Sequence, residues 1–121
     1  MHETGFLLHF PGAPEAINAD SFDEDVLESP VPVLIEFWAA RCSACRRLAP
    51  ELAALAGRFP DKLRVFTLNV DEELEAAVRF GVHSIPAVLL FAEGEEKARV
   101  LGFQPEAALA ELLEPFVSLE E

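Results

Sequence analysis

Apolar runs alternate with amphipathic segments along the chain, and this pattern predicts several strands and helices. The run 33–38 is almost continuously apolar, which is typical of a strand buried on both faces of a sheet, and 63–69 is predicted to be a second buried strand. A third strand is predicted over 87–91, and a turn at 93–95 leads it into a hairpin partner at 99–101. The strands therefore indicate a central sheet.

Helical periodicity characterises the segments between the strands. The longest predicted helix covers 42–59, and Pro50 inside it is expected to kink it. The apolar stripe of this helix is made of Leu48, Leu52, Leu55 and Phe59. Ser21 is expected to open a shorter helix with a capping box. The shorter helices are predicted over 21–27, 72–80 and from Pro105 onward.

This order of elements predicts one α/β domain with a mixed sheet and helices on both faces. The chain has 121 residues, which is long enough to bury an ordinary core. We assign residues 16–121 to the domain and 1–15 to an N-terminal extension, in which 6–10 form either a short strand or an extended arm. No internal repeat and no interdomain linker is found.

The formal net charge of −13 argues against nucleic acid and anionic membrane surfaces as partners. No apolar run approaches the roughly 20 residues of a membrane span. The first ten residues lack the basic and apolar regions of a signal peptide, so a cytoplasmic location is expected. We also expect the protein to be a monomer. Three of the nine basic residues nevertheless flank the only two cysteines: Arg41, Arg46 and Arg47.

Cys42 and Cys45 stand two residues apart at the start of the longest predicted helix. A structural zinc site would need two further ligands, and the three histidines are scattered. A structural disulfide over so short a loop would stabilise little. The spacing therefore favours a redox dithiol, with a metal or iron–sulfur centre shared by two chains as a minor alternative.

Within the pair, Cys42 is predicted to be the nucleophile, because it lies nearest the free N–H groups of the helix N-terminus. Cys45, one turn further in, is predicted to resolve the mixed disulfide. Arg41 and Arg46 would lower the pKa of the thiol further, or they are simply solvated; the sequence favours neither.

Glu36 interrupts the apolar strand 33–38. A carboxyl buried there should have a raised pKa, and behind the dithiol it could relay a proton to or from Cys45. The alternative is a strand-edge glutamate that reaches solvent. The role of Ile85-Pro86 is similarly open. Pro86 either simply begins a strand at an edge or a turn, or it follows a cis peptide bond that exposes the Ile85 backbone to an extended substrate peptide.

The motifs in their order resemble the thioredoxin family over residues 16–118. The matching stretches are Ser21–Leu27, Ile35–Ala39, Cys42-x-x-Cys45, Leu48–Pro50, Leu68–Asp71, Phe80–Pro86, Phe91–Glu95 and Gly102. The resemblance implies the thioredoxin fold, Pro86 as a cis-proline, and attacking and resolving roles for Cys42 and Cys45. It also places Glu36 at the family's buried-acid position. The substrate-binding residues that it implies are Trp38, Arg41, Ile85, Pro86 and Gly102.

The chain departs from the family pattern around the cysteines. The usual Trp-Cys-Gly-Pro-Cys is here Arg41-Cys42-Ser43-Ala44-Cys45, Glu36 stands where Asp is usual, and Thr67 replaces a typical lysine. We expect the Cys42 thiolate to be better stabilised than in an ordinary thioredoxin. The couple would then be more oxidising than roughly −270 mV.

Two functions follow as hypotheses. The first is a thiol–disulfide oxidoreductase that acts on disulfide-containing protein substrates. It would need no bound cofactor, but its electrons must come from a separate reductase of the thioredoxin-reductase type, because the chain has no nucleotide-binding motif. The second is a chaperone-like binding adaptor of the same fold, in which the dithiol is secondary.

Overall fold

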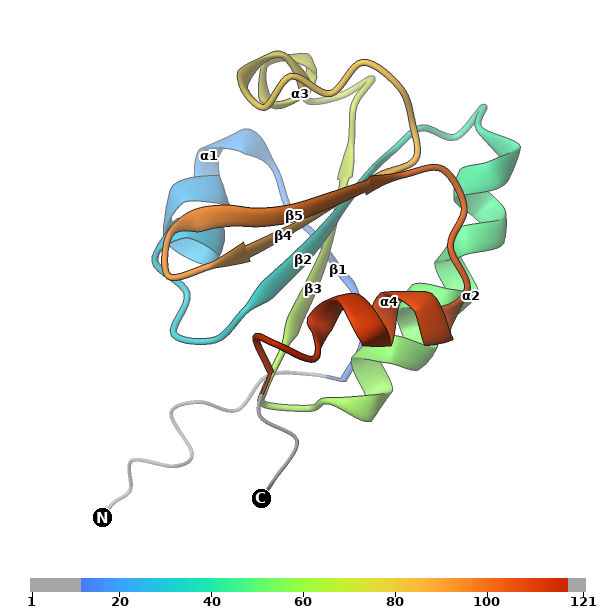
Figure 1. The fold of residues 1–121 in the computed structure, drawn as a ribbon. Helices are drawn as coiled ribbons and strands as arrows, with labels where there is room; N and C mark the ends of the chain where they lie inside the picture. Colours follow the sequence, from blue (N-terminus) through green and yellow to red (C-terminus); the bar gives the residue numbers. More distant parts are fainter. Residues whose placement is uncertain (1–11, 118–121) are drawn as a thin grey trace.

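Five strands form one sheet in the computed structural model, which describes residues 12–117. Their order across the sheet is β1-β3-β2-β4-β5 (Figure 1). The strands are β1 (Glu15–Ala16), β2 (Val33–Trp38), β3 (Arg64–Asn69), β4 (Ala87–Ala92) and β5 (Glu95–Leu101). β1, β3 and β2 run parallel, whereas β4 and β5 are antiparallel to their neighbours. The predicted mixed sheet is confirmed.

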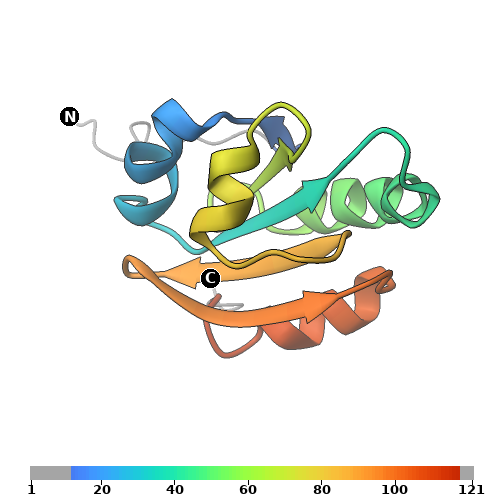
Figure 2. The same cartoon turned by 90° about the horizontal axis from the view of Figure 1, so that it is seen from above.

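Helices cover both faces of this sheet, as expected. They are α1 (Ala19–Phe22), the π-helical turn η2 (Asp23–Leu27), α2 (Ser43–Arg58), α3 (Leu74–Arg79) and α4 (Glu106–Leu113). Figures 1 and 2 show α1 and α3 on one side of the sheet and α4 on the other. α2 shares the side of α4, because Leu48, Leu52 and Leu55 belong to the same buried cluster as Leu109 and Leu113.

The apolar stripe of α2 is buried as predicted. Leu48, Leu52 and Leu55 are at most 1% exposed, and Phe59 is buried at the end of the helix. Pro50 lies inside α2, and the kink predicted there stays a prediction. The burial of one continuous stripe fixes the helix against the sheet and so fixes where its N-terminus, with the cysteines, must lie.

Some boundaries differ from the prediction. The capping box predicted at Ser21 is wrong: the helix begins two residues earlier, and the Asn18 side chain caps it by accepting the Ser21 N–H at 3.1 Å. β1 has only two residues, too few for a period-2 pattern to reveal. The predicted strand or arm at 6–10 lies outside the described residues.

Candidate active site

Cys42 and Cys45 are joined by a disulfide at the N-terminus of α2. Cys42 is the N-cap residue, and its Sγ accepts the backbone N–H of Cys45 at 3.1 Å. Its own N–H donates to the Ala39 carbonyl at 3.1 Å. Cys42 is partly exposed, whereas Cys45 is 2% exposed. A partner therefore reaches the Cys42 sulfur more easily.

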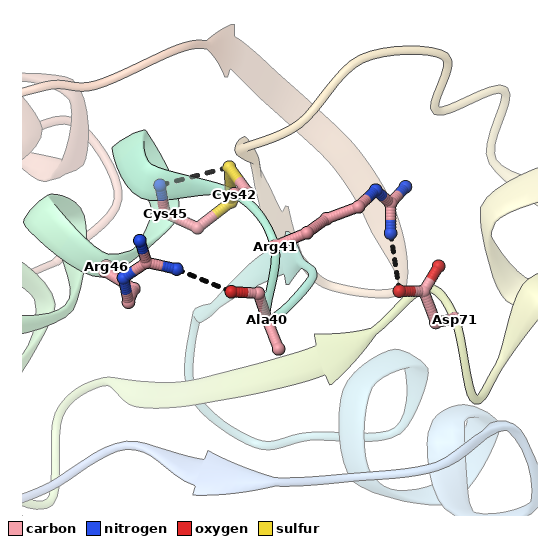
Figure 3. Close-up of a disulfide and its surroundings, with 6 residues drawn as sticks. All are labelled: Ala40, Arg41, Cys42, Cys45, Arg46 and Asp71. Atoms are coloured by element: carbon pink, nitrogen blue, oxygen red, sulfur yellow. Dashed lines mark hydrogen bonds and ion pairs between the residues drawn. A yellow bond between two sulfur atoms is a disulfide. The ribbon is translucent and has the colours of Figure 1, made fainter.

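The two arginines drawn beside the disulfide each donate a hydrogen bond to an oxygen atom and not to a sulfur (Figure 3). The Arg41 guanidinium donates to the Asp71 carboxylate at 2.5 Å, and both side chains are more than half exposed. The Arg46 guanidinium donates to the Ala40 carbonyl at 2.5 Å. In the oxidised protein the positive charge of Arg41 is therefore largely offset by its neighbour rather than directed at Cys42.

Glu36 lies at the middle of the sheet, since its strand β2 has β3 on one side and β4 on the other. Its residue is 3% exposed, so the alternative of a solvent-reaching edge glutamate is wrong. Burial raises the pKa of Glu36 to about 7. Among the described residues its Oε2 has no hydrogen-bond partner. The cross-strand neighbour in β3 is Thr67, which offers no charge to offset the carboxylate.

A cavity of about 180 Å³ joins the acid to the dithiol. It is lined by Glu36, Trp38, Cys45, Arg46, Ala49 and Thr67. The strand period of two explains this placement: Ile35 and Phe37 belong to the cluster on the α1 and α3 side, so Glu36 faces α2. The sequence therefore located the acid and its neighbour Cys45 correctly, and the tertiary structure adds the space between them.

The Ile85–Pro86 peptide bond is cis, as the resemblance implied. Pro86 is buried, and its carbonyl accepts the N–H of Gly102 at 2.8 Å. Gly102 has φ +86, a left-handed conformation that favours glycine. The hydrogen bond brings the end of β5 beside the proline and so joins two of the predicted substrate-binding residues.

A second cavity, of about 210 Å³, lies beside Arg41. Its lining includes Arg41 and Ile85, which brings these two predicted residues together. It also includes Asp71 and Leu74, neither of which the sequence had marked as functional. One acid among 22 carries no signal of its own, so only the contact with Arg41 singles out Asp71.

The model of the Thioredoxin family matches residues 13–115. The chain belongs to the thioredoxin family. This thioredoxin is 41% identical over 118 residues to the M-type chloroplastic thioredoxin of Pisum sativum, covering 95% of this chain and 69% of that one. It is 37% identical over 105 residues to a thioredoxin of Synechocystis sp., covering 87% of this chain and 98% of that one.

The fold comparison agrees. The solved structure of a mutant thioredoxin from Halobacterium salinarum superposes with a TM-score of 0.82 at 32% identity, covering 93% of this chain and 97% of that one. With its disulfide-forming Cys42–Cys45 pair, this thioredoxin is a thiol–disulfide oxidoreductase. Within residues 12–117 no helix is long and apolar enough to cross a membrane, and no three His, Cys, Asp or Glu side chains are grouped as metal ligands.

Proposed function

We propose that this thioredoxin reduces disulfides of protein substrates with Cys42 as the nucleophile and Cys45 as the resolving thiol. The observation that carries the assignment is the difference in exposure: Cys42 is the accessible N-cap, and Cys45 is buried one turn further in. The Cys45 N–H that meets the Cys42 sulfur would also stabilise a thiolate there.

The exchange has two steps. The Cys42 thiolate attacks one sulfur of the substrate disulfide, so that a mixed disulfide forms and the other substrate sulfur leaves as a thiolate. Cys45, as a thiolate, then attacks the Cys42 sulfur and releases the second substrate thiol. The substrate gains two electrons and the pair becomes the Cys42–Cys45 disulfide. A separate reductase of the thioredoxin-reductase type would return the two electrons, and no bound cofactor is proposed.

Glu36 is proposed to take the proton from Cys45 in the second step. The shared cavity supports this role, because it gives the carboxyl a route to the buried thiol through a space that could hold water. A pKa of about 7 suits a group that both accepts and returns a proton near neutral pH.

Substrate chains are proposed to lie across the exposed side of the disulfide. The contact residues would be Trp38, Arg41, Ile85, Pro86 and Gly102. The backbone of Ile85, next to the cis bond, is suited to pairing with an extended peptide. We further propose that the protein acts as a monomer in the cytoplasm, where thiols are kept reduced.

Trapping tests the proposed roles. Cys45→Ser should stall the mixed disulfide and accumulate covalent adducts with oxidised insulin, which dithiothreitol releases, whereas Cys42→Ser should form none. Wild type should accelerate insulin reduction by dithiothreitol, and neither variant should. Adducts on Cys42→Ser but not on Cys45→Ser would reverse the assignment. Equal, negligible activity of wild type and Cys42→Ser would favour the binding adaptor.

A further inference from the structure

Most, but not all, of the lysine and arginine side chains in this acidic protein form ion pairs with carboxylates. Within residues 12–117, at least six of the nine lysines and arginines form ion pairs with carboxylates: Arg41, Arg58, Arg64, Arg79, Lys97 and Arg99. Arg46 and Arg47, both exposed and next to the disulfide, form no such pair within residues 12–117. With 22 acidic residues in the chain, this leaves positive charge uncompensated at the site where substrates must bind.

Arg47 is held in place by an aromatic ring instead. Its guanidinium lies over the ring of Phe103, 4.8 Å from the centroid. Glu51, four residues along α2, is at the usual distance for a helical ion pair. Its Oε1 accepts the Glu106 N–H at 2.7 Å, where it caps α4. The carboxylate nearest in sequence on this helix is therefore hydrogen-bonded elsewhere, and among the residues that the structure describes Arg47 forms no ion pair.

The ring places this charge at the edge of the substrate-binding surface. Arg47 follows Cys45 by two residues, and Phe103 directly follows Gly102. Gly102 in turn donates its N–H to the carbonyl of Pro86. The Arg47 guanidinium therefore lies where α2 meets the loop after β5. Arg41, the basic residue directly before Cys42, is already paired with Asp71.

We propose that Arg47, supported by Phe103, binds a carboxylate of the disulfide substrate and makes this thioredoxin prefer substrates with an acidic group near the reactive disulfide. The proposal rests on the proposed function, because the carboxylate must arrive with the disulfide that Cys42 attacks. The net charge of −13 would otherwise repel acidic substrates, so a cation without a carboxylate partner at the edge of the substrate-binding surface has a specific effect on which disulfides can approach.

Two small disulfides that differ in charge test this preference. The reduced protein is mixed with 3,3′-dithiodipropionate, an anion, or with bis(2-hydroxyethyl) disulfide, which is neutral. In each reaction the two protein thiols become the Cys42–Cys45 disulfide, and the probe is reduced to two thiols. The rate constant for the anionic probe is divided by that for the neutral probe. A change in the reactivity of the protein thiols affects both rate constants equally and leaves this ratio unchanged. We expect Arg47→Gln to lower the anionic-to-neutral ratio about two- to fivefold, the range for one exposed charge pair.

Arg58→Gln is the matched control. Arg58 lies on the same helix and also stacks over a ring, that of Phe59 at 5.4 Å, but it pairs with Glu106 at 3.3 Å at the far end of α2. Its loss should leave the ratio unchanged. Added sodium chloride should narrow the difference in this ratio between wild type and Arg47→Gln, because salt screens the charge that the variant lacks.

The inference is wrong if Arg47→Gln keeps the wild-type ratio, or if Arg58→Gln lowers the ratio as much. It is also wrong if both rate constants fall equally in Arg47→Gln, since Arg47 would then act on the thiols and not on the substrate charge. Failure of wild type to reduce either probe would contradict the proposed function itself, and the inference with it.

Discussion

At the scale of single residues, the ion pair of Arg41 with Asp71 limits the effect of the Arg41 charge on Cys42. Its position before the nucleophile suggests that it stabilises the thiolate, yet its guanidinium is turned to Asp71 (Figure 3). Both side chains are exposed, so the ion pair itself is worth at most about 1 kcal/mol. Such a weak pair can be opened by one substitution, which makes its effect on Cys42 measurable.

Asp71→Asn should free Arg41 and remove a negative charge near Cys42. Both changes favour the thiolate, so the pKa of the Cys42 thiol should fall and the potential should rise by about 10–20 mV. Equilibration with glutathione measures the potential, and the pH dependence of alkylation measures the pKa. Wild type itself is expected above roughly −270 mV.

The same substitution in an Arg41→Gln background provides the control. The rise should be smaller there, because only the direct charge effect of Asp71 remains. An equal rise in both backgrounds would show that Asp71 does not hold Arg41 away from the sulfur. A wild-type potential at or below roughly −270 mV would contradict the expected stabilisation of the thiolate.

At the scale of elements, backbone conformation explains the β4–β5 hairpin. Glu93 has φ 56 and Gly94 has φ 81, and two consecutive positive values are typical of the turns that join antiparallel strands. The turn was predicted from Gly94 and its acidic neighbours, whereas β5 extends further toward the turn than the predicted 99–101. Its exposed polar residues, including Glu95, Glu96 and Lys97, gave no apolar signal for a strand.

Two glycine substitutions should change stability in opposite directions. Gly94→Ala should destabilise the protein by about 1 kcal/mol, because alanine is strained at positive φ. Its Cβ would also lie 3.3 Å from the Leu27 carbonyl oxygen. Gly57→Ala in α2 should stabilise it by up to about 1 kcal/mol, since the nearest atom to its Cβ is 3.9 Å away. Urea unfolding measures both, and a loss of stability in Gly57→Ala would contradict the helix-propensity argument.

At the scale of the whole molecule, two apolar clusters lie on opposite faces of one sheet. One lies against α1, η2 and α3, and the other against α2 and α4. Glu36 is the one buried charged residue among those that the structure describes, and it lies in the strand at the centre of both clusters. Its ionisation therefore affects the stability of the entire fold and not of one element.

Stability should accordingly fall as pH rises through the titration of Glu36. The folded pKa of about 7 lies above the ordinary value of 4.5, so the folded protein holds this proton more tightly than the unfolded chain. The contribution is present below pH 4.5 and is lost by about pH 7–8, and it amounts to at most about 3 kcal/mol. The free energy of unfolding of oxidised wild type, minus that of Glu36→Gln, should show this fall.

The exposed Glu111→Gln serves as the control for the removal of one carboxyl. Wild type and Glu111→Gln should keep a nearly constant difference between about pH 5 and 8. Parallel stability curves for wild type and Glu36→Gln would show that the carboxyl ionises in the folded protein as easily as in the unfolded chain.

Local patterns in the sequence were sufficient for much of this protein. The strand 33–38, the helix that carries the dithiol and the mixed sheet follow from local patterns and their order along the chain. Those patterns left two alternatives for Glu36, of which the structure shows the buried one. The Cys42–Cys45 spacing likewise determines the chemistry, because two thiols within one helical turn can form a disulfide without help from the rest of the chain.

Only the tertiary structure decided what surrounds that chemistry. The cavity between Glu36 and Cys45 and the pairing of Arg41 with Asp71 join residues from different elements. The support of Arg47 by Phe103 joins positions 56 residues apart (103 − 47). Side-chain charge and stacking act over a few ångströms in space, and no local pattern encodes which distant residues will lie that close. The sequence thus determined the reaction, and the packing decided which charges meet the substrate.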